Sequence, residues 1–375
     1  MDVGAQAALE RSIREDFANP SAGHRLGREL SARVEEIRQN ILRSAANEQF
    51  NLVFTSSATE ANNLAICGQD VEAAQRIWVS LADHPSLVRP AYAWQKAGVE
   101  VCEMPLRHGW IDWSRFAEQL NQRDRLMIFS HINNSSGQIQ ETGKRLVEIK
   151  DRWPQLHVHV DAVQSYGKMP SPLKAGPVDS ITISGHKMGG PKGVGALLYR
   201  RGCQLRPQLL GGGHELGLRS STLNVPGLVS WFAAIAATEG SCEENWCKVA
   251  LLNRLWRESF SQMDGVEFPF YPVGDAAGDS PLSPYILLMR LRGIPSDILM
   301  RHLDEAQIYV SSSSACSSRA QGENPVYKAL GLDRRQHGEL LRISFSQRTT
   351  QQEVARAAQY LAESYQALRR IYDLS

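Results

Sequence analysis

Two stretches decide the fold: HVHVDAVQ at residues 157–164 and SITISGHK at residues 180–187. Each begins as a β-type run and ends in polar residues that follow the run directly. Further β-type runs cover residues 51–55, 76–80, 126–130 and 195–199. Helix-length segments separate the runs, and strands joined in this way pair in parallel through crossovers. We therefore predict an α/β domain with a mainly parallel sheet over residues 15–240.

Helices are expected before and after this sheet. An amphipathic helix is predicted over residues 24–46, where apolar residues recur at helical spacing (Leu26, Leu30, Val34, Ile37 and Ile41). A long helix beginning near Pro226 leads out of the domain, and residues 351–372 form a helical tail. The intervening residues 264–284 are rich in Gly, Pro and Asp. We predict a second, smaller α+β domain over residues 245–375.

Composition excludes several classes of protein. The 375 residues contain 41 Lys and Arg against 40 Asp and Glu, so the chain lacks the basic surplus that a nucleic-acid partner requires. The first 17 residues mix acids with bases and contain no apolar run typical of a secretory signal. The most apolar helix-like stretch, residues 227–237, is about half the ~20 residues of a membrane span. We expect a cytoplasmic protein with no membrane partner, whose six scattered cysteines stay reduced.

The residues that follow the strands are the candidate ligand-binding groups, because open parallel sheets bind ligands at the carboxyl ends of their strands. After the first run, residues 55–61 (TSSATEA) enter a helix whose N-terminus would attract an anion; ordinary Ser/Thr capping is the alternative. Asp161 follows its run directly and could face a cationic ring nitrogen, or it could cap a helix. Lys187 follows residues 180–184 in a Gly-rich turn. Partial desolvation there would lower the lysine pKa enough for an imine to form, although most lysines are only solvated charges.

These three features together match what pyridoxal phosphate requires: an anion cradle for its phosphate, a carboxylate for its ring nitrogen and an amine for its aldehyde. Cys316 lies in a polar loop, VSSSSACSSR at residues 310–319, where an exposed thiolate could react. Cys242 and Cys247 have no histidine partners nearby in sequence, so we predict no metal site. No P-loop or dinucleotide-binding glycine spacing is present, which disfavours nucleotide binding.

The chain resembles the cysteine desulfurases, pyridoxal-phosphate enzymes of the class V aminotransferase group that supply sulfur for iron–sulfur clusters. The motifs are TEANNLAI (59–66), HINN (131–134), VDAVQS (160–165), GHK (185–187), GGGHE (211–215) and SACSS (314–318). The similarity extends from Phe17 to Thr350. It implies fold type I of the pyridoxal-phosphate transferases, with a large cofactor-binding domain and a small C-terminal domain that carries the catalytic cysteine.

The resemblance also implies roles for individual residues. Lys187 would bond to the cofactor aldehyde, Asp161 would pair with the ring nitrogen and His84 would stack on the ring. Asn134 and Gln164 would hydrogen-bond the ring oxygen and its surroundings. The cofactor-binding set is Ala58, Thr59, Asn134, Asp161, Gln164, Ser184, Gly185, His186, Lys187 and Thr222. Thr222 would reach the phosphate of a second subunit, which implies a homodimer, and Arg342 would clamp the substrate carboxylate unless it is a surface arginine.

The reaction implied by the resemblance converts L-cysteine to L-alanine and leaves a persulfide on Cys316. The persulfide would then pass to an iron–sulfur scaffold or another sulfur-acceptor protein. Two alternatives stay open on the residues alone. One is a pyridoxal-phosphate lyase or aminotransferase acting on another amino acid, and the other is a non-catalytic paralogue that keeps the fold.

The sequence also departs from the family pattern. The family opens with a segment similar to Leu-Asp-Asn-Ala-Ala-Thr-Thr-Pro, and this chain begins after it, so either its start is misassigned or part of the pocket wall is missing. Serine replaces the usual glycine at Ser221, Ser313 and Ser346, and Gly189 replaces a bulky residue. If the family glycines have positive φ, each serine would cost about 1 kcal/mol. From these departures we expect an activity below that typical of the family.

Overall fold

The computed structural model describes residues 1–45, 49–170, 177–271, 282–312 and 325–372. The chain splits into two compact units. The first contains Met1–Pro105, Asp112–Ile132 and Glu141–Cys242, and the second contains Leu106–Ile111, Asn133–Gln140 and Glu243–Ser375. Two short segments from within residues 15–240 therefore belong to the second unit.

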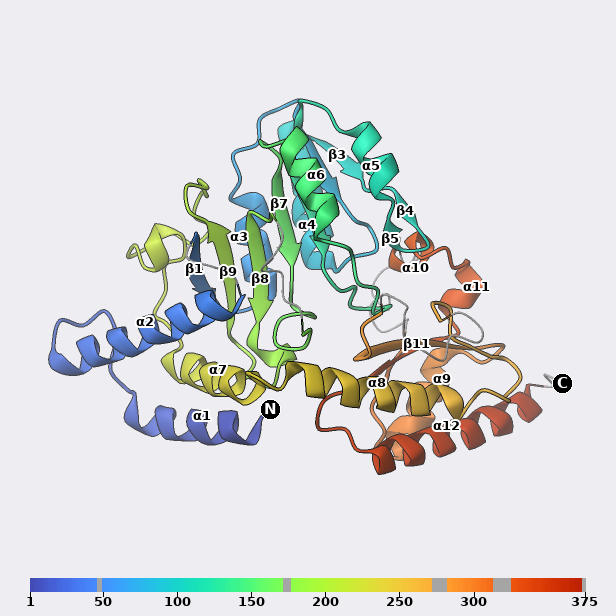
Figure 1. The fold of residues 1–375 in the computed structure, drawn as a ribbon. Coiled ribbons are helices and arrows are strands. Elements are labelled where there is room, and N and C mark those ends of the chain that lie inside the picture. The colour runs from blue at the N-terminus through green and yellow to red at the C-terminus, as the bar shows by residue number, and fades with distance from the viewer. Residues whose placement is uncertain (46–48, 171–176, 272–281, 313–324, 373–375) are drawn as a thin grey trace. The chain divides into compact units, whose positions relative to one another are not determined.

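The first unit is built on a seven-stranded sheet (Figure 1). Its order is β1 (Phe50–Thr55), β9 (Gly195–Arg200), β8 (Ser180–Ser184), β7 (His157–Asp161), β6 (Asp124–Ser130), β2 (Arg76–Val79) and β3 (Glu100–Glu103). All six predicted runs are strands, and the edge strand β3 is the one that the sequence analysis missed. The α/β class and the mainly parallel sheet are confirmed, because β3, β2, β6, β7 and β8 pair in parallel.

The expectation of parallel pairing is wrong for β1 and β9. Strand β9 runs antiparallel to both β8 and β1. Only residues 185–194 connect β8 to β9, and they contain no helix beyond the short 3-10 turn Gly185–Lys187. A parallel crossover needs a dozen or more residues, so the chain returns as a hairpin.

Helices flank the strands of the first unit: α1 (Val3–Glu15), α2 (Arg25–Ala45), α3 (Ala58–Cys67), α4 (Pro85–Ala93), α5 (Trp113–Gln119), α6 (Lys144–Arg152) and α7 (Val225–Thr238). Helix α2 confirms the predicted amphipathic helix, whereas α1, which packs on α7, was not predicted. The helix expected to begin near Pro226 is confirmed as α7, which begins at Val225, but it is shorter than expected and ends at Thr238. Gly240 adopts a left-handed φ of 80°, which ends the first helix before α8 (Cys242–Glu258) begins.

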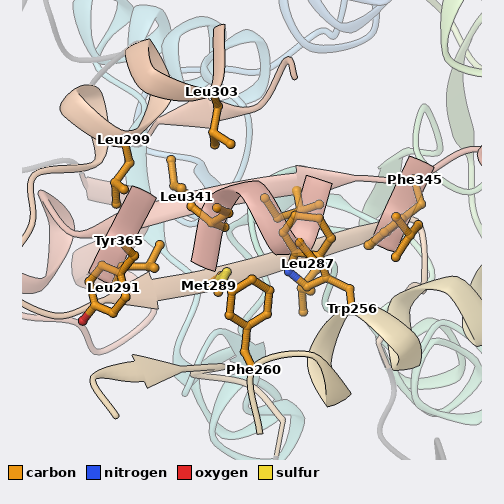
Figure 2. Packing of buried hydrophobic residues seen from close by; sticks show 14 of the residues in the cluster. Trp256, Phe260, Leu287, Met289, Leu291, Leu299, Leu303, Leu341, Phe345 and Tyr365 are labelled. Carbon is orange, nitrogen blue, oxygen red and sulfur yellow. The ribbon is translucent and has the colours of Figure 1, made fainter. Parts of the chain in front are cut away.

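The second unit contains an antiparallel sheet in the order β10 (Val266–Glu267), β11 (Ile286–Leu291), β13 (Leu340–Ser344) and β12 (Ser311–Ser312). Its other elements are β4 (Leu106–Arg107), β5 (Trp110–Ile111), α9 (Ser296–Glu305), α10 (Pro325–Ala329), α11 (Arg334–His337) and α12 (Gln351–Ile371). Helix α12 confirms the predicted tail. Apolar side chains from α8, α9, α12 and the sheet form one core, in which Trp256, Leu287, Leu299 and Tyr365 are buried (Figure 2).

Among the helices that lie in the described ranges, none is both long enough and apolar enough to cross a membrane.

Candidate active site

Strand β7 carries a polar face inside the first unit. Side chains alternate along a strand, so His157, His159 and Asp161 share one face while Val158 and Val160 take the other. His159 and Asp161 are paired in register with Ser180 and Thr182 of β8. Strands at the centre of a parallel sheet are normally apolar on both faces. This polar face therefore indicates a function other than packing.

Asp161 stands at the carboxyl end of β7, where its side chain is buried. Its Oδ1 accepts a hydrogen bond from the backbone N–H of Val163 at 2.9 Å, and its Oδ2 accepts one from Asn62 Nδ2 at 2.9 Å. Burial raises the pKa of the Asp161 carboxyl, while these two hydrogen bonds and His84 act against the rise. The side chain does more than cap a turn, because one oxygen is held by the amide of Asn62 from helix α3.

Lys187 ends the 3-10 turn that follows β8 directly. The expectation of a partly desolvated lysine is wrong for this side chain, which is exposed. A second lysine near this turn, Lys168, was missed by the sequence analysis, and its amine is desolvated. Lys168 Nζ donates to Gln164 Oε1 at 3.0 Å, and burial, with the charge of Lys187, lowers the pKa of Lys168 to about 7. The only sequence signal for Lys168 was its position four residues after Gln164.

Several basic side chains influence one another electrostatically at this turn. His186 Nδ1 lies 2.8 Å from the hydroxyl oxygen of the buried Ser184. Burial lowers the pKa of His186, and the charges of Lys187, Lys168 and Lys192 lower it further. An anion placed among these groups would relieve their mutual repulsion.

The N-terminus of α3 is the place where the sequence predicts an anion cradle. Ser57 is the N-cap, and its side chain accepts the backbone N–H of Glu60 at 3.2 Å, so the capping alternative is confirmed, whereas the anion cradle stays a prediction. The first N–H groups of a helix have no acceptor within the helix, which leaves those of Ala58 and Thr59 directed outward. A Cβ at Gly195 would lie 2.8 Å from the Ser57 carbonyl carbon, so this glycine lets β9 pass directly beside the cradle.

His84 is the N-cap residue of α4, and it is exposed. Its Nδ1 accepts the backbone N–H of Ser86 at 3.1 Å and lies 2.8 Å from Ser86 Oγ. The preceding residue, Asp83, is buried and was not predicted; its Oδ2 accepts the N–H of Ser130 at 2.8 Å. Burial raises the pKa of Asp83 to about 7, and the negative charge of Asp161 contributes to the rise.

Two predicted site residues belong to the second unit. Arg342 on β13 is half-buried, so it is not a simple surface arginine. Its Nη1 donates to the carbonyl of Asn134 at 3.0 Å and its Nη2 donates to Ser311 Oγ at 3.0 Å. Arg342 Nε and Asn134 Oδ1 are buried and find no hydrogen-bond partner among the described residues. These two atoms remain available to a ligand.

The remaining predicted residues are placed as follows. Thr222 is exposed, while Cys316 and Ser313 lie outside the described residues. Ser221 and Ser346 do not adopt positive φ, so the expected strain at these two serines is wrong. Gly189 does adopt a left-handed φ of 95°. Within the described part of the chain, no group of three or more His, Cys, Asp or Glu side chains could hold a metal ion.

Comparisons with known proteins find similar families, relatives and structures. The aminotransferase class-V family model matches residues 6–357. Cysteine desulfurase IscS 1 of Archaeoglobus fulgidus is 33% identical over 374 residues, covering 98% of this chain and 95% of that protein. Cysteine desulfurase IscS of Salmonella schwarzengrund is 32% identical over 361 residues, covering 94% of this chain and 86% of that protein. Among solved structures, a NifS-like protein superimposes with a TM-score of 0.86 at 26% identity, covering 98% of this chain and 96% of that one.

Proposed function

Because the chain belongs to the aminotransferase class-V family, and within it to the cysteine desulfurases, we propose that it takes sulfur from L-cysteine and releases L-alanine. One observation carries the proposal. A buried carboxylate, Asp161, and an amine, Lys187, follow the carboxyl ends of adjacent parallel strands in the same unit as the α3 anion cradle. The relatives that match almost the whole chain are cysteine desulfurases by name.

The donor set supports pyridoxal phosphate as the cofactor. Thr182 Oγ1, in register with Asp161, is buried and finds no partner in the part of the chain that the structure describes. Together with the carboxylate, the amine and the outward N–H groups of α3, it fits a polar aromatic ligand that carries a phosphate. Ala58, Thr59, Ser184, Gly185 and His186 would hold the phosphate, with Thr222 contributing from a second copy of the chain. Asn134 and Gln164 would bind the ring oxygen and its surroundings.

When bound, pyridoxal phosphate supplies an electron sink for the α-carbon of the substrate. The chain's own groups then have separate tasks. Asp161 holds the proton of the ring nitrogen, His84 packs on the ring face and Lys187 moves the α-proton. Arg342 binds the substrate carboxylate through its guanidinium, whose Nε remains free among the described residues.

Cys316 is the nucleophile in this proposal, a role supported by the sequence resemblance and the named relatives. Its thiolate bonds to the sulfur of L-cysteine while the carbon–sulfur bond of the substrate breaks. The electron pair of that bond stays with the carbon, which takes up a proton. One L-cysteine and one thiol therefore give one L-alanine and one persulfide, which passes to an iron–sulfur scaffold or another acceptor protein.

The test is to incubate the purified protein with pyridoxal phosphate and L-cysteine and to measure alanine together with the mass of the Cys316 peptide. We expect alanine and a gain of one sulfur atom on that peptide. Cys316→Ala should bind the cofactor normally but form no alanine, and Lys187→Ala should lose the covalent label that borohydride otherwise leaves at position 187. Turnover of another amino acid that survives Cys316→Ala would favour a lyase or aminotransferase. A protein that binds no cofactor would favour a non-catalytic paralogue.

A further inference from the structure

A continuous chain of hydrogen bonds leads from β8 to the Asp161 carboxylate. Ser180 Oγ lies 2.8 Å from His159 Nδ1, and His159 Nε2 lies 3.2 Å from Asn62 Oδ1. Asn62 Nδ2 then donates to Asp161 Oδ2 at 2.9 Å. Ser180, His159 and Asn62 are all fully buried in the first unit. Three polar side chains that are inaccessible to solvent therefore stand behind one carboxylate.

The donors and acceptors allow only one direction of donation along this series of hydrogen bonds. A carboxylate only accepts, so Asn62 must turn its amide nitrogen to Asp161 and its carbonyl oxygen to His159. His159 must then carry its hydrogen on Nε2. Burial lowers the pKa of His159 to about 3, so the ring is neutral and its Nδ1 accepts the Ser180 hydroxyl. Each hydrogen bond in this series therefore has its donor on the side away from Asp161 and its acceptor on the side toward Asp161.

A second histidine, His157, extends the series of hydrogen bonds beyond Ser180. His157 Nε2 lies 2.8 Å from the same Ser180 Oγ. Ser180 has one hydrogen and gives it to His159, so His157 must donate through Nε2. Gln69 Nε2 donates one of its two hydrogens to the carbonyl of Ala65 at 2.9 Å and lies 3.3 Å from His157 Nε2. The Ser180 oxygen is thus satisfied as both donor and acceptor.

Asn62 is also the branch point to His84. Its Nδ2 lies 2.9 Å from Ser86 Oγ, so the second amide hydrogen goes to that hydroxyl. Ser86 Oγ is 2.8 Å from His84 Nδ1, which also accepts the N–H of Ser86. His84 Nδ1 must therefore be an acceptor, with its hydrogen on Nε2. One amide group therefore bonds to Asp161 directly and is linked to His84 through the Ser86 hydroxyl.

We propose that Asn62 is a positioning residue for the cofactor. Its amide holds the Asp161 carboxylate that would face the ring nitrogen and, through the Ser86 hydroxyl, supports the imidazole that would pack on the ring. Ser180 and His159 fix the orientation of the amide itself. This inference rests on the proposed function, because it assigns the cofactor contacts of Asp161 and His84.

The first test is Asn62→Leu, which keeps the side-chain volume but removes the amide. We expect the affinity for pyridoxal phosphate to fall about tenfold or more, as typical for loss of a hydrogen bond to a charged group. We also expect the ring nitrogen of 15N-labelled cofactor, observed by NMR at pH 8, to lose protonation relative to the parent. The matched control is Asn253→Leu in the second unit. Asn253 is a buried asparagine whose Nδ2 donates to the Pro284 carbonyl at 3.1 Å, and its loss should change neither readout.

A folded Asn62→Leu protein with affinity within twofold of the parent and an unchanged ring-nitrogen signal would overturn the inference. A second measurement needs no variant: 15N-histidine NMR of the parent should show the hydrogen of His84 and His159 on Nε2. A hydrogen on Nδ1 of His159 would also overturn it, even if Asn62→Leu fails to fold. If the parent itself binds no pyridoxal phosphate, the proposed function fails first, so the two failures are distinguishable.

Discussion

The two units differ in what surrounds one of their buried strands, although both contain apolar clusters. Around β7 the first unit buries His157, His159 and Asp161 in a hydrogen-bonded network with α3 and β8. The second unit fills its core with Trp, Leu, Met, Phe and Tyr side chains from α8, α9, α12 and the sheet (Figure 2). Buried polar groups cost free energy unless each is satisfied, whereas apolar burial is stabilising by itself. We infer that the polar groups buried around β7 orient the Asp161 side chain, at a cost in free energy that their hydrogen bonds offset.

Acidification should produce the largest difference between the units. Burial lowers the pKa of His131 and His157 to about 4 and that of His159 to about 3. Unfolded histidines titrate near 6.5, so between these values the unfolded chain holds more protons than the native one. The stability from these groups is full above pH 6.5 and is lost as the pH falls toward 4. Each histidine contributes a loss of about 1.4 kcal/mol per pH unit between its unfolded and folded pKa values.

Hydrogen exchange followed by mass spectrometry at pH 7 and pH 4.5, corrected for the intrinsic rates, would check this. Peptides of β7 should lose protection while those of β11 keep it, because apolar side chains do not titrate. Asp83 acts in the opposite direction, since its pKa is raised to about 7 and it gains a proton in the native state. Asp83→Asn should therefore steepen the acid sensitivity. Equal loss of protection in both units would contradict the comparison.

Truncating a side chain in the apolar core of the second unit should lower the free energy of unfolding without changing the affinity for pyridoxal phosphate. Leu299 on α9 is fully buried in the second unit's core (Figure 2). Leu299→Ala should lower the free energy of unfolding by about 2–5 kcal/mol, through lost burial and the cavity that remains. Denaturant unfolding would measure this cost, and the affinity for pyridoxal phosphate of the folded variant should match the parent. Leu299→Met, which keeps the volume, is the control and should cost less than about 1.5 kcal/mol. A weaker cofactor affinity in folded Leu299→Ala would show that the apolar core also sets the site.

The sequence predicted strand positions well, because β-type runs followed by Gly, Ser or Asp are local signals. It did not predict that β9 is antiparallel, since that depended on recognising residues 185–194 as too short for a crossover. Asp161 and Lys187 were found because strand ends are visible in sequence. Asn62 was not, because its partners are 24 to 99 residues away and only the fold brings them together. The alternation of His157, His159 and Asp161 was the available signal for the polar network.

The smallest expected effects concern two positions where the chain departs from its family, one in each unit. Gly189 has a φ of 95°, so Gly189→Ala should destabilise the first unit by about 1 kcal/mol. Ser346 has no such strain, and its Oγ accepts the N–H of Arg348 at 3.2 Å. Restoring the family residue with Ser346→Gly should therefore destabilise by about 0.5 kcal/mol, through the lost hydrogen bond and the greater freedom of the unfolded chain.

Thermal unfolding of both variants beside the parent would measure these costs. A rise in stability for Ser346→Gly would mean that the serine is strained in a way that its backbone does not show. An unchanged stability for Gly189→Ala would mean that the turn after Lys187 relaxes out of the left-handed conformation at no cost. In that case the bulky residue of the family could also be accommodated at position 189, and its absence here would be a matter of chemistry at the site rather than of backbone geometry.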